Sequence, residues 1–127
     1  MTLKELNAAL QSINGGIWLW DPFDFETDMV ATVKFDKKVA YRAFPVGKAP
    51  KLPFICYVAT QTNNFDADNK VFHVLQDVDI ELYTKDKSEA LENLVESKLN
   101  ELNLVWDKYE EWLDSEECYE IIYSITL

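Results

Sequence analysis

Apolar residues recur along this chain at two spacings, and each spacing predicts one kind of secondary structure. Recurrence every three or four residues predicts amphipathic helices over residues 3–13 and 86–102. Thr2, with Glu5 three residues later, forms a capping-box pattern at the start of the first helix. The glycine pair at 15–16 is expected to end that helix.

The second helix is expected to begin at Asp86, because aspartate is a favoured N-cap and Glu89 follows three residues later. Its apolar stripe is formed by leucines and one valine between residues 91 and 102. The charged residues between these positions are expected on the solvent side: Glu92, Glu96, Lys98 and Glu101.

Alternation of apolar and polar residues predicts strands at 39–44, 54–60, 72–82, 104–113 and 119–127. Pro50 and Pro53 mark 45–53 as a loop, and the polar run 61–69 is predicted as a turn or a longer hairpin loop. On strand 72–82 one face is apolar, while the other carries His73, Asp77, Asp79 and Glu81. One apolar and one polar face is typical of an antiparallel sheet that is covered on one side.

Residues 17–38 hold an aromatic cluster and are predicted to form a hairpin-like excursion whose second half, 29–35, is a strand. The cluster consists of Trp18, Trp20, Phe23 and Phe25. Two interpretations are open: the rings form an exposed contact surface, or they pack on the sheet.

The order of these elements predicts the fold class. Strands and helices do not alternate as in a doubly wound parallel fold, so we expect an α+β fold with a mainly antiparallel sheet and two helices packed on one face. A length of 127 residues is that of one domain, here residues 1–127, with 17–38 as a hairpin-like excursion.

The negative net charge of the chain argues against two classes of function. Asp and Glu total 23 against 12 Lys and Arg, which gives a formal net charge of -11. A free nucleic-acid-binding domain and a protein of anionic membrane surfaces usually carry the opposite sign. The acid excess is explained by solubility or, alternatively, by a surface past which DNA moves without binding.

The sequence offers no catalytic or metal-binding constellation, so we expect a protein that is not an enzyme and that has no cofactor or metal. His73 is the only histidine, and Cys56 and Cys118 are expected to be small, half-buried thiols in a reducing compartment. Asp66 and Asp68 could hold a cation in a loop, but turn chemistry is the preferred interpretation. A signal peptide and a membrane span are not expected from this sequence.

The stretch from Leu52 onward resembles the tail terminator family of long-tailed bacteriophages, also called tail completion or tail-to-head joining proteins. Four motifs in succession carry the resemblance: Leu-Pro-Phe-Ile-Cys-Tyr at 52–57, Asp-Ala-Asp-Asn at 66–69, Ile-Glu-Leu-Tyr-Thr-Lys at 80–85 and Asp-Ser-Glu-Glu-Cys-Tyr-Glu-Ile-Ile-Tyr at 114–123. The match covers about the last 75 residues, and residues 17–38 depart from it.

This resemblance implies a virion structural protein that closes into a homo-oligomeric ring, typically a hexamer, at the head-proximal end of the tail. Such a ring stops polymerisation of the tail tube protein and presents a surface to the head–tail connector, while DNA passes through without specific binding. Assembly would occur in the host cytoplasm. Candidate contact residues are the aromatic cluster and a second group in the 61–69 loop: Asn63, Asn64, Phe65, Asp66 and Asp68.

Three alternatives remain at the level of sequence. The first is another head–tail joining or minor tail component. The second is an acidic inhibitor that mimics nucleic acid and captures a basic protein. The third is a small enzyme that uses carboxylates, with or without a metal.

Overall fold

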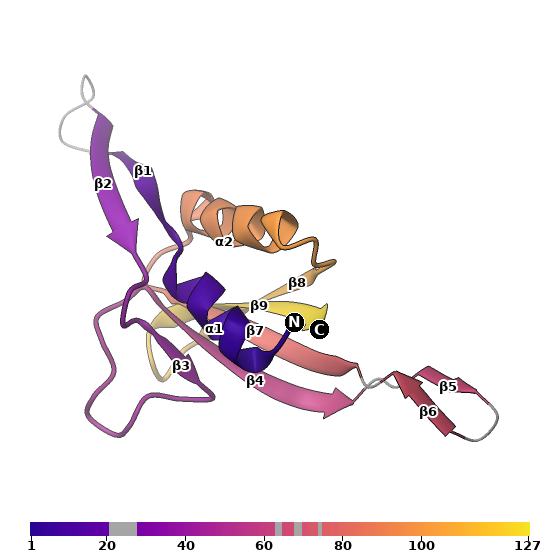
Figure 1. Cartoon of the computed structure of the whole chain (residues 1–127). Coiled ribbons are helices and arrows are strands. Elements are labelled where there is room, and N and C mark those ends of the chain that lie inside the picture. The colour runs from indigo at the N-terminus through magenta and orange to yellow at the C-terminus, as the bar shows by residue number, and fades with distance from the viewer. Residues whose placement is uncertain (21–27, 63–64, 68–69, 74) are drawn as a thin grey trace.

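The computed structural model describes residues 1–20, 28–62, 65–67, 70–73 and 75–127. Figure 1 shows a five-stranded sheet with two helices on one face and two separate β-ribbons. The order of strands in the sheet is β3 (Val39–Tyr41), β4 (Phe54–Thr62), β7 (Gln76–Thr84), β9 (Cys118–Thr126) and β8 (Asp107–Leu113). Neighbouring strands are antiparallel except for β3 and β4, which are parallel. The predicted α+β fold with a mainly antiparallel sheet is confirmed.

Helix α1 (Leu3–Gln11) begins as the capping-box pattern predicts and ends earlier than expected. The Thr2 hydroxyl accepts a hydrogen bond from the Glu5 amide at 3.1 Å. The last turn closes at Ser12, whose hydroxyl donates to the Ala9 carbonyl at 2.6 Å. Gly15 therefore does not end the helix, and the glycine pair instead belongs to β1.

Helix α2 (Glu89–Glu101) begins two residues later than predicted. Ser88, not Asp86, is the N-cap, because the Ser88 hydroxyl accepts from the Leu91 amide at 3.3 Å. A short hydroxyl side chain satisfies this otherwise unpaired amide as well as a carboxylate does.

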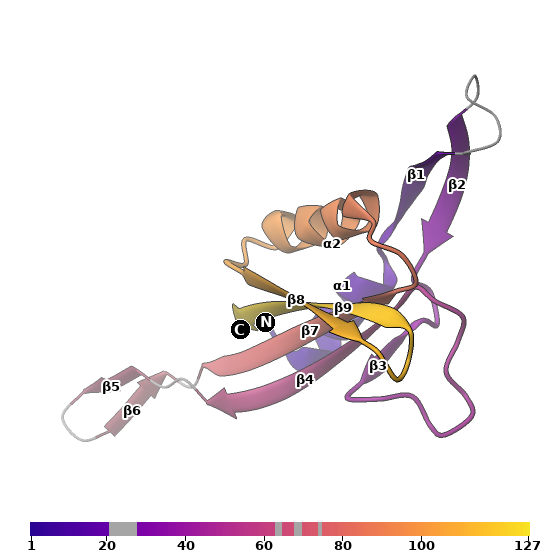
Figure 2. The same cartoon turned by 180° about the vertical axis from the view of Figure 1, so that it is seen from behind.

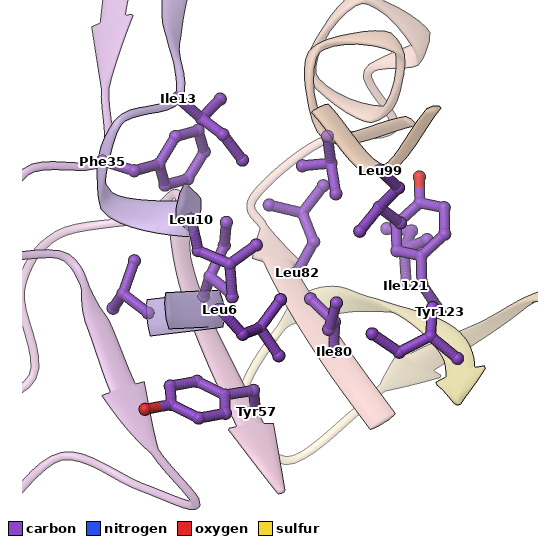
Figure 3. Packing of buried hydrophobic residues seen from close by; sticks show 14 of the residues in the cluster. Leu6, Leu10, Ile13, Phe35, Tyr57, Ile80, Leu82, Leu99, Ile121 and Tyr123 are labelled. Atoms are coloured by element: carbon purple, nitrogen blue, oxygen red, sulfur yellow. The ribbon is translucent and has the colours of Figure 1, made fainter. Parts of the chain in front are cut away.

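The core lies between the helices and one face of the sheet (Figure 3). The strand register places Ile55 opposite Leu82 and Leu82 opposite Ile121 in the three central strands. This row is covered by Leu6 and Leu10 of α1 and by Leu91, Val95 and Leu99 of α2. Among the residues whose burial is described, Tyr123 is the largest fully buried side chain, and its hydroxyl donates to Glu96 Oε2 at 2.8 Å.

The first ribbon pairs β1 (Asn14–Trp20) with β2 (Asp28–Lys34) over their whole length. Its base is anchored in the core, because Ile13 and Phe35 are buried and the Phe35 amide donates to the Ile13 carbonyl at 3.1 Å. Gly15 brings this base against α2, since a Cβ there would lie 2.6 Å from Leu94 Cδ2. Beyond that base the ribbon extends away from the body (Figures 1 and 2).

The second ribbon pairs β5 (Phe65–Ala67) with β6 (Lys70–His73), and it corrects the prediction of one strand over 72–82. In the main sheet β7 begins at Gln76, which exchanges backbone hydrogen bonds with Leu127. Strand β6 pairs with β5, whereas β7 pairs with β4 and β9, so different pairing partners divide the predicted strand. The bonds between Gln76 and Leu127 tie the last residue of the predicted strand 119–127 to the sheet.

Strand β3 is shorter than the predicted strand 39–44. Arg42 has a φ of 66°, a left-handed conformation that ends the extended run, and its amide donates to the Tyr57 carbonyl at 2.7 Å. Residues 42–53 then form a long loop beside β4, in the region predicted as a loop from its prolines.

Candidate interaction surfaces

The sheet face opposite the helices, termed the open face, carries the acidic residues predicted on strand 72–82. Asp77, Asp79 and Glu81 lie at every second position of β7 and therefore on this face. Glu120 of β9 and Glu111 of β8 lie directly opposite each other on the same face. The open face is thus a row of carboxylates across three neighbouring strands.

Neutral hydroxyls donate to three of these carboxylates. Thr126 Oγ1 donates to Asp77 Oδ1, and Ser124 Oγ donates to Asp79 Oδ1, both at 2.8 Å. Tyr83 donates through its hydroxyl to Glu81 Oε2 at 2.6 Å. These bonds hold the carboxylates in place without neutralising them, so the face keeps its negative charge.

Glu120 lies close to the negative charges of Glu81 and Glu111 on this face. Burial raises its pKa, and the nearby charges of Glu81 and Glu111 raise it further, against a lowering hydrogen bond from Tyr83. Burial and the bond to Glu81 likewise raise the pKa of Tyr83, which stays protonated. An uncharged tyrosine among carboxylates can donate a hydrogen bond but offers no base or nucleophile at neutral pH.

The 42–53 loop covers one end of the open face and leaves a hollow of about 440 Å³. The apolar side chains of Phe44, Phe54 and Leu113 line it, together with the charged residues Arg42 and Glu116. Both cysteines also line it. They are free and more buried than the half-buried thiols predicted.

Burial, with the charges of Glu81 and Glu120, raises the pKa of the Cys56 thiol to about 11. Burial, followed by the charges of Glu116 and Glu120, also raises the pKa of Cys118. The thiolate is the reactive form of cysteine, so both side chains are poor nucleophiles at neutral pH. The hollow is therefore a packing feature with inert thiols.

Glu92 contradicts the sequence prediction, because it is buried beneath α2 rather than on the solvent side. Its side chain is 2% exposed and forms ion pairs with Lys87 at 2.8 Å and Lys108 at 3.1 Å. Lys108 also pairs with Glu96 at 3.1 Å, and Lys87 with Glu110. Lys87, just before α2, and Lys108 of β8 make it feasible to bury this carboxylate.

The pKa values of both lysines reflect this cluster. Hydrogen bonds to Glu110 and Glu92 raise the pKa of Lys87. Burial lowers the pKa of Lys108, but its bonds to Glu92 and Glu96 outweigh burial and raise the pKa overall. Both lysines are charged at neutral pH, and the cluster ties β8 to α2.

The predicted contact residues fall on two separate ribbons rather than on one site. Trp18 and Trp20 are on β1, opposite Val30 and Asp28 of β2. The ribbon that carries them and the β5–β6 ribbon leave the body at opposite ends (Figures 1 and 2).

The second predicted group is only partly within the described structure. Phe65 lies opposite His73, and Asp66 lies opposite Val71, with an irregular register between them. The other predicted contact residues lie outside the described residues: Phe23, Phe25, Asn63, Asn64 and Asp68.

Sequence reasoning missed the exposed aromatic residues of β8. Tyr109 and Trp112 are 57% and 49% exposed on a strand at the edge of the sheet. Their strand was predicted, but alternation alone does not tell an edge strand from a central one.

Two further features were searched for in the described ranges. Among these residues, no group of three or more His, Cys, Asp or Glu side chains is arranged to hold a metal ion. Neither described helix is long and apolar enough to cross a membrane.

Comparison with known proteins assigns no family. No protein-family model matches this chain, and a search of curated proteins finds no match.

Proposed function

We propose that this chain is a ring-forming tail terminator of a long-tailed bacteriophage, a virion protein that caps the tail tube and receives the head connector. The observation that carries the proposal is the pair of ribbons that extend from opposite ends of the body (Figures 1 and 2). The sequence motifs between residues 52 and 123 add the resemblance to that family.

The ribbons favour an assembly subunit because a two-stranded ribbon alone is marginally stable in water. Among the described residues the β5–β6 ribbon has its extensive contacts within itself, and the β1–β2 ribbon is anchored at its base by Ile13, Phe35 and Gly15. Both ribbons also leave backbone groups free along their edges. Neighbouring subunits, the tube or the connector would supply the surface that stabilises them.

The open face suits a protein that surrounds DNA without binding it. Its carboxylates at Asp77, Asp79 and Glu81 repel phosphate, and their hydroxyl partners hold them in place. We place this face toward the channel of the ring. A basic channel wall in a structure of the assembled ring would contradict this placement.

Deletion of the reading frame from the encoding phage tests the proposal. Electron microscopy should then show tails of irregular length and heads without tails, and supplying the protein in trans should restore joined particles. Complementation by the Lys4→Glu variant, which changes an exposed charge on α1, serves as the control for expression. Normal joined particles without the protein would refute the proposal. Gold labelling of the protein elsewhere in the virion would instead support another head–tail or minor tail component.

The second candidate is an acidic inhibitor that mimics nucleic acid, and the carboxylate row of the open face favours it. Such a protein should remain a monomer and bind a basic partner in a one-to-one complex. Reversing Asp79 and Glu81 to lysine should abolish that complex, whereas a tail terminator with the same changes should still cap tails.

A further inference from the structure

The positive charges of this acidic chain are concentrated at one edge of the sheet. Residues 34–51 contain six of the twelve Lys and Arg residues and a single acid, Asp36, which gives this segment a net charge of +5. Lys37 and Lys38 lie just before β3, and Arg42 follows it directly, so the charges flank an edge strand. Within the described ranges none of the six cations forms an ion pair inside the chain.

Negative charges are concentrated at the other edge. Residues 107–120, which comprise β8 and the turn into β9, contain seven acids and one lysine, a net charge of -6. That lysine, Lys108, is turned toward α2 and bound to Glu92 and Glu96. The side chains of Asp107 and Glu111 are exposed on the strand, so its outward charge is almost purely negative.

Strands β3 and β8 lie at opposite edges of the sheet, whereas the loop after β3 and the turn after β8 approach each other, because Arg42 and Glu116 line the same hollow. β3 and β8 are the first and last strands of the order, four spacings apart, which corresponds to about 19 Å between them. Charges at this distance are screened from each other at physiological ionic strength. The two edges therefore act as separate surfaces of opposite sign.

Exposed large apolar side chains lie on the same two segments. Tyr41 is 47% exposed and Val46 fully exposed on the basic segment, and Tyr109 and Trp112 are about half exposed on the acidic one. Aromatic residues inside a ring of charges are typical of protein interfaces. Each edge thus carries exposed apolar side chains beside charge of one sign.

We propose that copies of this chain associate head to tail, with the basic β3 edge of one copy against the acidic β8 edge of the next. Two different, complementary surfaces form a heterologous interface, which closes into a ring when the rotation between copies permits it. The contact deepens the ring assembly proposed above by naming the surfaces that join subunits. It makes no use of the tube or the connector.

Charge reversal at each edge tests the contact. One variant is acidic at both edges, because four reversals change residues 34–51 from +5 to -3: Lys37→Glu, Arg42→Glu, Lys48→Glu and Lys51→Glu. The other is basic at both edges, because four reversals change residues 107–120 from -6 to +2: Asp107→Lys, Glu111→Lys, Asp114→Lys and Glu117→Lys. Lys4→Glu and Glu101→Lys reverse exposed charges away from both edges and serve as matched controls. Circular dichroism should show that all four proteins fold.

Analytical ultracentrifugation at low salt then measures association. The wild type and both controls should form oligomers, with apparent affinity falling on the order of tenfold between 0.05 and 0.5 M NaCl as screening increases. Each edge variant alone should be monomeric, and an equimolar mixture of the two should assemble. A monomeric wild type, or a mixture that fails to assemble while both variants are folded, would overturn the proposal.

The same variants separate this inference from the proposed function. Edge variants that assemble normally and still complement a deletion phage would overturn the contact and leave the terminator function standing. The opposite outcome has two parts: assembly of the purified protein is salt-sensitive and is abolished by either edge variant, but the phage makes normal tails without the protein. The contact would then stand, and the proposed function would be refuted.

Discussion

Removing the two lysines around Glu92 should destabilise this protein more than removing Glu92 itself. In the double variant Lys87→Met with Lys108→Met, the Glu92 carboxylate remains buried beneath α2 with no cation beside it. In Glu92→Met, by contrast, the lysines are 43% and 36% exposed and keep Glu110 and Glu96 as partners. Both perturbations remove the two ion pairs of Glu92, but only the double lysine variant also removes the pairs with Glu110 and Glu96 and leaves a buried carboxylate behind.

The expected magnitudes follow from that difference. Leaving an uncompensated buried charge costs about 3–5 kcal/mol, a large part of the roughly 5–15 kcal/mol that stabilises a domain. Replacing the buried acid by a side chain of similar volume should change the free energy of unfolding by no more than about 1 kcal/mol. The triple variant, which lacks the acid and both lysines, should recover most of the loss of the double variant.

Urea denaturation followed by circular dichroism at one protein concentration measures all three variants. Lys98→Met is the control, because its pair with Glu101 at 3.1 Å is exposed on the Glu101 side and should contribute less than about 0.5 kcal/mol. A double variant as stable as Glu92→Met would refute the reasoning. So would a triple variant no more stable than the double one, because the loss would then come from the lysine stems.

Three further predictions concern the open face, the first helix and the thiols. Glu120→Gln should stabilise the fold by about 0.2–1 kcal/mol at pH 7, because it removes the like charge opposite Glu111. Since the folded-state pKa of Glu120 is raised, this gain in stability should shrink as the pH falls through that pKa toward 4. A gain that is unchanged at pH 3 would contradict this prediction. Thr2→Ala should cost about 1 kcal/mol in urea melts through loss of the N-cap, and Thr2→Ser should restore it. Cys56, with a pKa of about 11, should react with iodoacetamide at pH 8 far more slowly in the folded than in the urea-unfolded protein, and equal rates would show that it is not buried.

Local patterns in the sequence predicted what depends on local chemistry. The capping residue Thr2, the apolar stripe of α2 and the alternation of β7 and β9 each follow from neighbours a few residues apart. Together they were enough for the fold class, because the count and order of such elements restrict how they can be layered.

What the sequence missed depends on partners far along the chain. Burial of Glu92 requires Lys87 and also Lys108, which lies sixteen residues further on, in β8. Helical spacing alone therefore placed Glu92 in solvent. The break between β6 and β7 depends on their different pairing partners, β5 for β6 and β4 with β9 for β7. No periodicity within residues 72–82 contains that information.

The buried ion cluster and the charge asymmetry of the two edges are connected. Lys108 is the only cation of the acidic segment, and its pairing with Glu92 and Glu96 turns it away from the outer edge of β8. Without the Glu92 carboxylate, Lys108 would keep only Glu96 as a partner and would be held less firmly away from the exposed acids beside it. Glu92 therefore has a role that its small contribution to stability does not explain: it helps to keep the β8 edge negative. In the proposed contact, the basic β3 edge of the next copy is the surface that this negative edge attracts.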